Sequence, residues 1–193
     1  MARRSKYLKN MTGRDKNFLK QLARTGVTDR SQAVKFSKMN LNRLRQLENS
    51  KYITRENRCV SGRSTEIIRL ADKGKYFCKE KLEIKELAHA QTNHLEHDLN
   101  VTLAYNNLSE EERETWQHER QIIRELNSKI KDIDQKYKNS DGRLKTCIDA
   151  RATINGQIVA IEVVGSSYTQ ADIELKEDIA LNVAGCDDIF TIG

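Results

Sequence analysis

The sequence predicts an α+β protein made of two domains with opposite charge. Residues 1–85 carry 23 Lys and Arg against 8 Asp and Glu, whereas residues 86–193 carry 11 against 20. Apolar residues recur at helical spacing through much of the basic part. The acidic part contains two strand-like runs joined by Asn155-Gly156, a dipeptide typical of tight β-hairpins. We therefore expect a basic domain over residues 1–85 and an acidic domain over residues 86–193.

The composition is typical of a globular protein with a large polar surface. Of the 193 residues, 37% are hydrophobic and 32% are charged. No run approaches the roughly 18 apolar residues of a membrane-spanning helix, so a membrane is not an expected partner. The four cysteines are scattered and form no C-x-x-C pair, which favours reduced thiols and a cytoplasmic location.

Three short helices and a hairpin are expected in the basic domain. The first helix covers roughly residues 14–24, and Thr28 or Asp29 can cap the second. Ser37 can cap the third, whose leucines recur at helical spacing. Two strand-forming runs follow, with an arginine-rich loop between them. A helix, a helix, a charged helix and a basic hairpin, in this order, form a winged helix-turn-helix.

The run LNRLRQLENSKYITRENRCVSGRSTEIIRLADKGKYF resembles the third helix and wing of bacterial winged-helix regulators. Leu70-Ala71-Asp72-Lys73-Gly74 resembles the Leu-Thr-x-x-Gly motif that starts their next helix, with Ala in place of Thr. The resemblance implies double-stranded DNA as the partner. The DNA-binding residues of the helical part would be Lys38, Asn40, Asn42, Arg43 and Arg45, the first four of them facing the major groove. Those of the wing, which would touch phosphates, are Arg55, Arg58 and Arg63. A merely solvated basic face, or a winged helix that binds protein, remains the alternative.

Helical patterns continue through the middle of the chain. Residues 75–90 are expected to form one helix that leaves the basic domain as a linker or dimerisation arm. His94 and His97 share the apolar face of a second helix, which favours core histidines over a metal site that needs more ligands. Apolar residues recur every three or four positions over residues 122–137, which predicts a third helix. Residues 116–119 either continue that helix backward or form a short strand.

The strongest chemical signal is a pair of acidic residues across the predicted hairpin. Asp149 lies at the start of the alternating run, and Glu162 interrupts the almost continuously apolar run Ile158 to Val164. A carboxylate in such apolar surroundings is costly unless a cation compensates it. A plain structural reading is an exposed Asp149 and a Glu162 that forms a salt bridge, for example to Arg151 or Lys176.

After the hairpin, Ser166, Ser167 or Thr169 can cap a helix over about residues 170–183, and a strand over residues 187–192 follows. The order helix, short strand, hairpin, helix, strand resembles the αβββαβ core of the restriction-endonuclease-like, or PD-(D/E)xK, fold. The resemblance implies that Asp149 and Glu162 bind Mg²⁺ while a lysine two residues later orients or deprotonates the water.

That lysine position is Val164 in this chain. Lys176, from the following helix, is the candidate replacement, because some members of the fold family recruit a lysine from there. An upstream acid, Glu119 or Glu96, could complete the metal site. The sequence leaves open whether this domain is catalytic.

Three features in this order resemble the replication-relaxation family of plasmid and mobile-element proteins. They are the winged helix, an H-D-L-x-V helix (His97, Asp98, Leu99, Val101) and the run I-D-A…G-Q-I-V-A-I-E-V. The resemblance implies a DNA-binding accessory protein in plasmid replication or mobilisation, with a relaxase or replication protein as a further partner. Two alternatives stay open. One is a Mg²⁺-dependent endonuclease or nickase that uses Lys176. The other is a winged-helix transcriptional repressor whose C-terminal half forms a homodimer.

Overall fold

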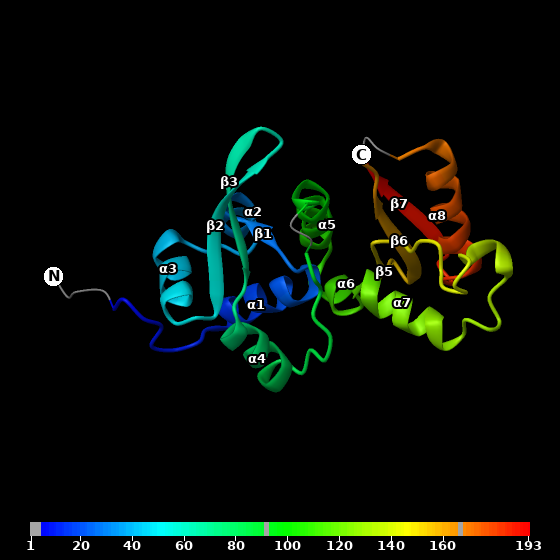
Figure 1. Cartoon of the computed structure of the whole chain (residues 1–193). Coiled ribbons are helices and arrows are strands. Elements are labelled where there is room, and N and C mark those ends of the chain that lie inside the picture. Colours follow the sequence, from blue (N-terminus) through cyan, green and yellow to red (C-terminus); the bar gives the residue numbers. More distant parts are fainter. Residues whose placement is uncertain (1–4, 91–92, 166–167) are drawn as a thin grey trace. The chain divides into compact units, whose positions relative to one another are not determined.

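The structure, a computed structural model, describes residues 5–90, 93–165 and 168–193. It is α+β, with helices and a three-stranded antiparallel sheet in the N-terminal part and a mixed four-stranded sheet with helices in the C-terminal part (Figure 1). The chain divides into two compact units, Met1–Asn106 and Asn107–Gly193. This division lies beyond the expected boundary at residue 85, because α5 (Leu95–Asn107) packs within the first unit. The Thr102 hydroxyl of α5 donates to the Val27 carbonyl over 2.7 Å.

The first unit has a small sheet with strand order β1-β3-β2, in which both pairs are antiparallel. Its core holds apolar side chains of α1, α3 and the sheet, among them Phe18, Leu44 and Ile68. The elements are α1 (Gly13–Thr25), β1 (Thr28–Asp29), α2 (Arg30–Lys35), α3 (Leu41–Asn49), β2 (Ile53–Val60), β3 (Arg63–Leu70), α4 (Asp72–Lys81) and α5.

The helix starts of the first unit follow their capping residues. Asp29 caps α2 by accepting the Gln32 N–H over 2.7 Å, as one of the two expected alternatives. The expected cap of the third helix, Ser37, is wrong: Asn40 accepts the Arg43 N–H over 2.9 Å, and α3 begins at Leu41. An Asn in the extended conformation can cap in this way, and it satisfies one backbone donor that the helix itself leaves free.

The helix expected over residues 75–90 is only partly present. Helix α4 covers Asp72–Lys81, and Glu83 then adopts a left-handed backbone conformation (φ 56°) that ends helical continuation. The chain turns back on α1, where the Ala88 N–H donates to the Ala23 carbonyl over 2.8 Å. Ile84 and Leu87 pack on the core of the first unit. This segment is therefore part of the first unit and is not an arm that leaves it.

The second unit is built around the sheet β4-β5-β6-β7. Strands β4, β5 and β6 pair antiparallel, whereas β7 runs parallel to β6, and α8 makes the crossover between these two strands (Figure 1). The elements are α6 (Glu110–Glu114), β4 (Gln117–His118), α7 (Glu119–Ser128), the 3-10 helix η1 (Gln135–Tyr137), β5 (Ala150–Ile154), β6 (Gln157–Val163), α8 (Gln170–Asn182) and β7 (Asp188–Ile192).

Helix α7 changes the expected order of elements. A short strand does precede it, one of the two alternatives at residues 116–119, but the helix then ends at Ser128 and not near residue 137. The Ser128 hydroxyl donates to the Glu125 carbonyl over 2.6 Å, which satisfies a carbonyl of the last turn. Since α7 lies between β4 and the hairpin, the order αβαββαβ contains one helix more than the expected αβββαβ.

The hairpin β5–β6 agrees with the sequence prediction. Asn155 and Gly156 both have positive φ (50° and 84°), as a type I′ turn requires. Strand β6 is buried from Val159 to Val163; it lies between β5 and β7, and Ala160 packs in a core with side chains of α7 and α8. Among the described residues, no helix is long and apolar enough to cross a membrane.

Candidate functional site

Helix α3 exposes a polar edge on the first unit. Leu44 and Leu47 are buried in the core, whereas Asn42 and Arg45 on the opposite side are exposed. Lys38, in the turn before the helix, is exposed as well, although its ammonium donates to the Lys35 carbonyl over 2.7 Å. Amide and guanidinium groups on one helix edge can reach base edges or phosphates.

Arg43 does not belong to this edge. Its guanidinium is paired with Asp15, which is fully buried at the start of α1, and it donates to the Asn10 carbonyl over 2.8 Å. Burial alone would raise the pKa of Asp15, but hydrogen bonds from Arg43 and Thr12 hold it below its usual value. Arg43 therefore fixes α3 against α1, and the DNA contact expected of it stays a prediction.

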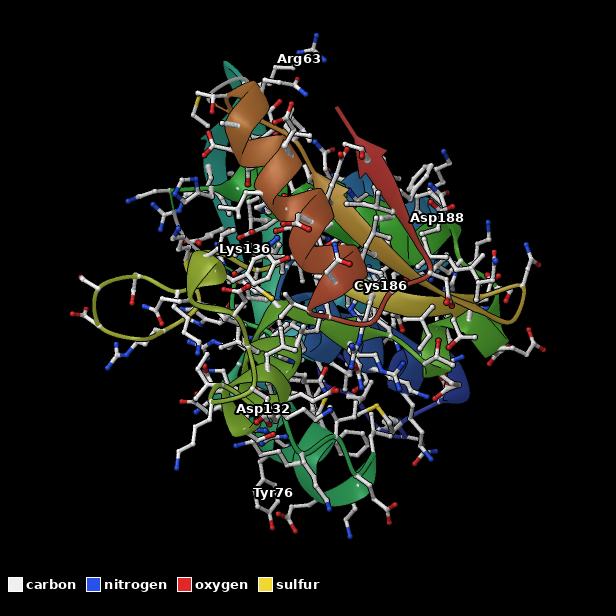
Figure 2. The ribbon with its side chains drawn as sticks, turned by 90° about the vertical axis from the view of Figure 1, so that its right-hand side faces the viewer. Arg63, Tyr76, Asp132, Lys136, Cys186 and Asp188 are labelled. Atoms are coloured by element: carbon white, nitrogen blue, oxygen red, sulfur yellow. The ribbon has the colours of Figure 1, made fainter. Side chains whose placement is uncertain are left out.

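The arginines of the β2–β3 hairpin also differ in role. Arg55 pairs with Glu48 over 2.7 Å and with Glu66 over 3.0 Å, so it connects α3 to the hairpin. Arg58 is half-exposed and pairs with Glu56 over 2.7 Å. Arg63 lies at the far end of the hairpin (Figure 2), is exposed, and has no ion pair within the described part of the chain. Of the three hairpin arginines predicted to bind DNA, Arg58 and Arg63 are therefore better placed for contacts with an outside anion than Arg55, whose side chain is 14% exposed.

A hollow of about 420 Å³ opens where α1 and α3 begin. Arg14, which the sequence reasoning did not single out, lines it together with Lys38 and Asn40. The Asn40 side-chain oxygen is used in capping, so its role is chiefly structural. Arg14 adds a cation to the surface around the start of α3.

The two predicted acids of the second unit face each other across the hairpin. Asp149 comes directly before β5, one residue ahead of the Ala150–Ile161 pair, so it lies opposite Glu162 of β6. The Asp149 N–H donates to Glu162 Oε2 over 3.3 Å, and the Val163 N–H donates to Asp149 Oδ2 over 2.8 Å. The side chains are only 10% and 3% exposed, respectively.

Lys176 of α8 supplies the cation that these acids need. Its ammonium donates to Glu162 Oε1 and lies 4.0 Å from Asp149 Oδ1. Burial opposes its charge, but the carboxylates of Asp149 and Glu162 outweigh burial and raise the pKa of Lys176. Burial and the neighbouring Asp149 raise the pKa of Glu162 to about 7, although Lys176 acts in the other direction. The lysine therefore stays charged, while the acid pair can hold one proton below neutral pH.

Tyr168, which the sequence reasoning missed, completes the cluster. Its hydroxyl lies 3.0 Å from Lys176 Nζ, and its own pKa is raised because of burial. Thr169 caps α8 by accepting the Asp172 N–H, which fixes the helix start between Tyr168 and Lys176. The other expected caps, Ser166 and Ser167, lie outside the described residues. No local pattern in the sequence indicates a tyrosine eight residues before the lysine as its partner.

Two other candidates are placed differently. Arg151 does not pair with Glu162; its guanidinium is bound by Glu125 of α7 and donates to Gln117 over 2.7 Å. Glu119, the first residue of α7, donates its N–H to the Asp149 carbonyl over 2.8 Å, but its side chain is exposed. Glu96 belongs to α5 of the first unit. Within the described ranges, no three His, Cys, Asp or Glu side chains cluster as a metal site would require.

The acid pair nevertheless fits Mg²⁺ in one respect. Mg²⁺ is commonly held by one or two carboxylates together with water and substrate phosphate, and Asp149 and Glu162 offer such hard oxygen donors. The Lys176 ammonium occupies the same space, so it would have to move away from Glu162 on binding. Searches against family models, curated proteins and solved structures found no match for this chain.

Proposed function

We propose that the first unit is a winged helix-turn-helix domain that binds double-stranded DNA. The observation that carries this proposal is the exposed edge of α3, with Asn42 and Arg45, beside a hairpin that presents Arg58 and Arg63. In this proposal α3 enters the major groove and the hairpin contacts phosphates. The excess of Lys and Arg over residues 1–85 supports a polyanionic partner.

Binding to duplex DNA at increasing salt tests this proposal. Affinity should fall steeply as salt rises, because each contact of a Lys or Arg with phosphate releases a counterion. Arg45→Ala should cost about 1–3 kcal/mol on a preferred sequence, as expected for a base contact. Lys79→Ala, at an exposed position of α4, is the matched control and should change affinity little. Binding that does not depend on salt, or that Arg45→Ala leaves unchanged, contradicts the proposal.

For the process served, we propose an accessory role in the replication or mobilisation of a plasmid or mobile element. The resemblance to the replication-relaxation family supports it, as does the combination of a DNA-binding unit with a unit that holds an Asp-Glu-Lys cluster. A relaxase or a replication protein is then the proposed protein partner. Co-purification of such a protein with the full chain, and its loss on deletion of residues 107–193, would test this part.

The Asp149-Glu162-Lys176 cluster favours a second candidate, a Mg²⁺-dependent endonuclease or nickase with a restriction-endonuclease-like domain. Asp149 and Glu162 would hold the ion, which would neutralise charge on the scissile phosphate and activate a water. Lys176 would take the place of the lysine missing at Val164. Its ammonium, held by Tyr168, would stabilise the negative charge that develops on the phosphate.

Nicking of supercoiled plasmid in Mg²⁺ tests this candidate. Asp149→Asn, Glu162→Gln and Lys176→Met should each abolish nicking that the wild type performs. Glu174→Gln, on the exposed side of the same helix, should leave it unchanged. If the wild type nicks no DNA, or if nicking survives all three substitutions, the cluster serves only to stabilise the second unit.

A further inference from the structure

The segment Ser5–Met11, which we call the N-terminal arm, is tied along one side of α3. Leu8 and Met11 pack partly into the core of the first unit. Side chains of α3 and its C-cap bind the backbone of the arm. The bonds are Gln46 Nε2 to the Ser5 carbonyl (2.9 Å), Asn49 Nδ2 to the Lys6 carbonyl (3.0 Å), the Leu8 N–H to Ser50 Oγ (2.9 Å) and Arg43 to the Asn10 carbonyl (2.8 Å).

Helical geometry places the arm and the hairpin on opposite sides of α3. Residues 43, 46 and 50, which hold the arm, lie on one side at about 100° per residue, and residue 49, which binds the Lys6 carbonyl, points from there toward the exposed edge. Glu48, which pairs with Arg55 of β2, points about half a turn away from them. The exposed Asn42 and Arg45 lie between these two sides. The exposed edge of α3 is thus flanked by the hairpin on one side and by the arm on the other.

The arm presents basic side chains while its backbone is held. Lys6 and Lys9 are exposed, and Tyr7 between them is 55% exposed. The Lys6 ammonium lies 5.9 Å from the centre of the Tyr7 ring. No acidic residue occurs before Asp15 in the sequence. Because the backbone is already ordered against α3, little conformational entropy is lost when these side chains bind an anion.

From this arrangement we propose that the N-terminal arm is a DNA-contacting element in its own right. With α3 in the major groove, the arm and the hairpin contact phosphates on the two opposite sides of that groove. Lys6 and Lys9 neutralise phosphates beyond the reach of Arg58 and Arg63. The inference rests on the proposed DNA binding by α3, and it adds a second flank to that interface.

The first test compares two double variants that each remove two positive charges. Lys6→Ala with Lys9→Ala changes the arm, and Lys79→Ala with Lys81→Ala changes exposed residues at the end of α4. Affinity for a short mixed-sequence duplex is measured from about 50 to 200 mM salt. The arm variant should reduce the slope of log K against log salt by about 2, at roughly 0.9 per phosphate contact, and the control should not. Equal slopes for the two variants overturn the inference.

The second test places a fluorescent reporter on the arm. Tyr7→Trp and Tyr76→Trp put a tryptophan at two exposed tyrosines of the first unit, one on the arm and one on α4. A saturating concentration of duplex DNA should change the fluorescence emission of the tryptophan introduced by Tyr7→Trp. The emission of the tryptophan introduced by Tyr76→Trp should stay unchanged. If DNA binds but Tyr7→Trp does not respond, the arm is not a contact, although the proposed DNA binding stands. If no DNA binds at all, the proposed function itself fails.

Discussion

Replacing Lys176 by Met gives the strongest test of how the second unit is held together. The variant keeps an unbranched side chain in the same space but removes the only ammonium seen next to Glu162 among the described residues. Two carboxylates that are 10% and 3% exposed would then face each other without a cation. Removal of one partner from a buried ion pair costs about 3–5 kcal/mol. We expect a loss of this size at pH values where Glu162 is ionised.

The loss of stability in Lys176→Met should depend on pH, and the pKa of Glu162 determines whether it grows or shrinks as pH rises. The pKa of Glu162 is raised to about 7 even with Lys176 present, and removal of the lysine raises it further. Below that pH the folded variant can keep Glu162 protonated, which removes most of the repulsion. The penalty should therefore be small near pH 5 and grow as pH rises through about 7, by up to roughly 1.4 kcal/mol per pH unit.

Urea unfolding followed by the fluorescence of Trp116 measures this effect. Trp116 is the one tryptophan of the chain, is 3% exposed and belongs to the second unit, so its emission reports on that unit. Glu162→Gln added to Lys176→Met should recover much of the loss at high pH, because it removes the uncompensated charge. Mg²⁺ should stabilise the single variant if the two acids can bind the ion. A loss below about 1 kcal/mol at high pH, or no recovery in the double variant, would refute the reasoning.

Three further predictions concern stability. In the wild type, the raised pKa of Glu162 contributes to the free energy of unfolding. This contribution is fully present below pH 4.5, the usual pKa of a Glu, and is lost as pH rises to about 7. Glu162→Gln should therefore flatten this part of the pH profile of stability measured by urea unfolding. Gly74→Ala should lower the melting temperature of the first unit, because its Cβ would lie 2.0 Å from the Tyr52 carbonyl oxygen, an overlap that costs at least about 1–3 kcal/mol. Arg43→Met should cost about 3–5 kcal/mol in urea, because it leaves Asp15 buried without its partner, whereas Arg45→Ala should leave stability unchanged.

Local patterns predicted those elements that local interactions determine. The Asn155-Gly156 turn was predicted correctly because turn chemistry depends on a few adjacent residues. The helix expected over residues 75–90 failed because tertiary contacts outweigh helical propensity after Lys81. The helix expected over residues 122–137 ends early, at Ser128, for a similar reason. After Ser128, Ile133 packs on the core from a loop and Tyr137 is buried in a 3-10 helix.

Predicting which charged residues are exposed needs the tertiary partners. Arg43 and Arg55 look in the sequence like other basic residues of a DNA-binding face. Their partners Asp15 and Glu66 come from a different helix and a different strand, 28 and 11 residues away, and no spacing rule connects them. The charge excess of the first unit is real, but part of it is neutralised inside the unit.

The position of Lys176 shows how a cation reaches the acid pair although position 164 is a valine. Alternate residues of a strand point to the same face of a sheet, so a lysine two residues after a strand carboxylate could reach it, but β6 ends at Val163 and position 164 lies beyond it. In this chain α8 crosses that face on its way from β6 to β7, because a parallel pair needs such a crossover. Lys176 thereby reaches Glu162 from above the sheet, with Tyr168 at the helix start holding its ammonium. An Asp, a Glu and a Lys thus come together from the residue before β5, from β6 and from α8, and plasmid nicking and the Lys176→Met unfolding experiment together decide whether they act on DNA or only stabilise the unit.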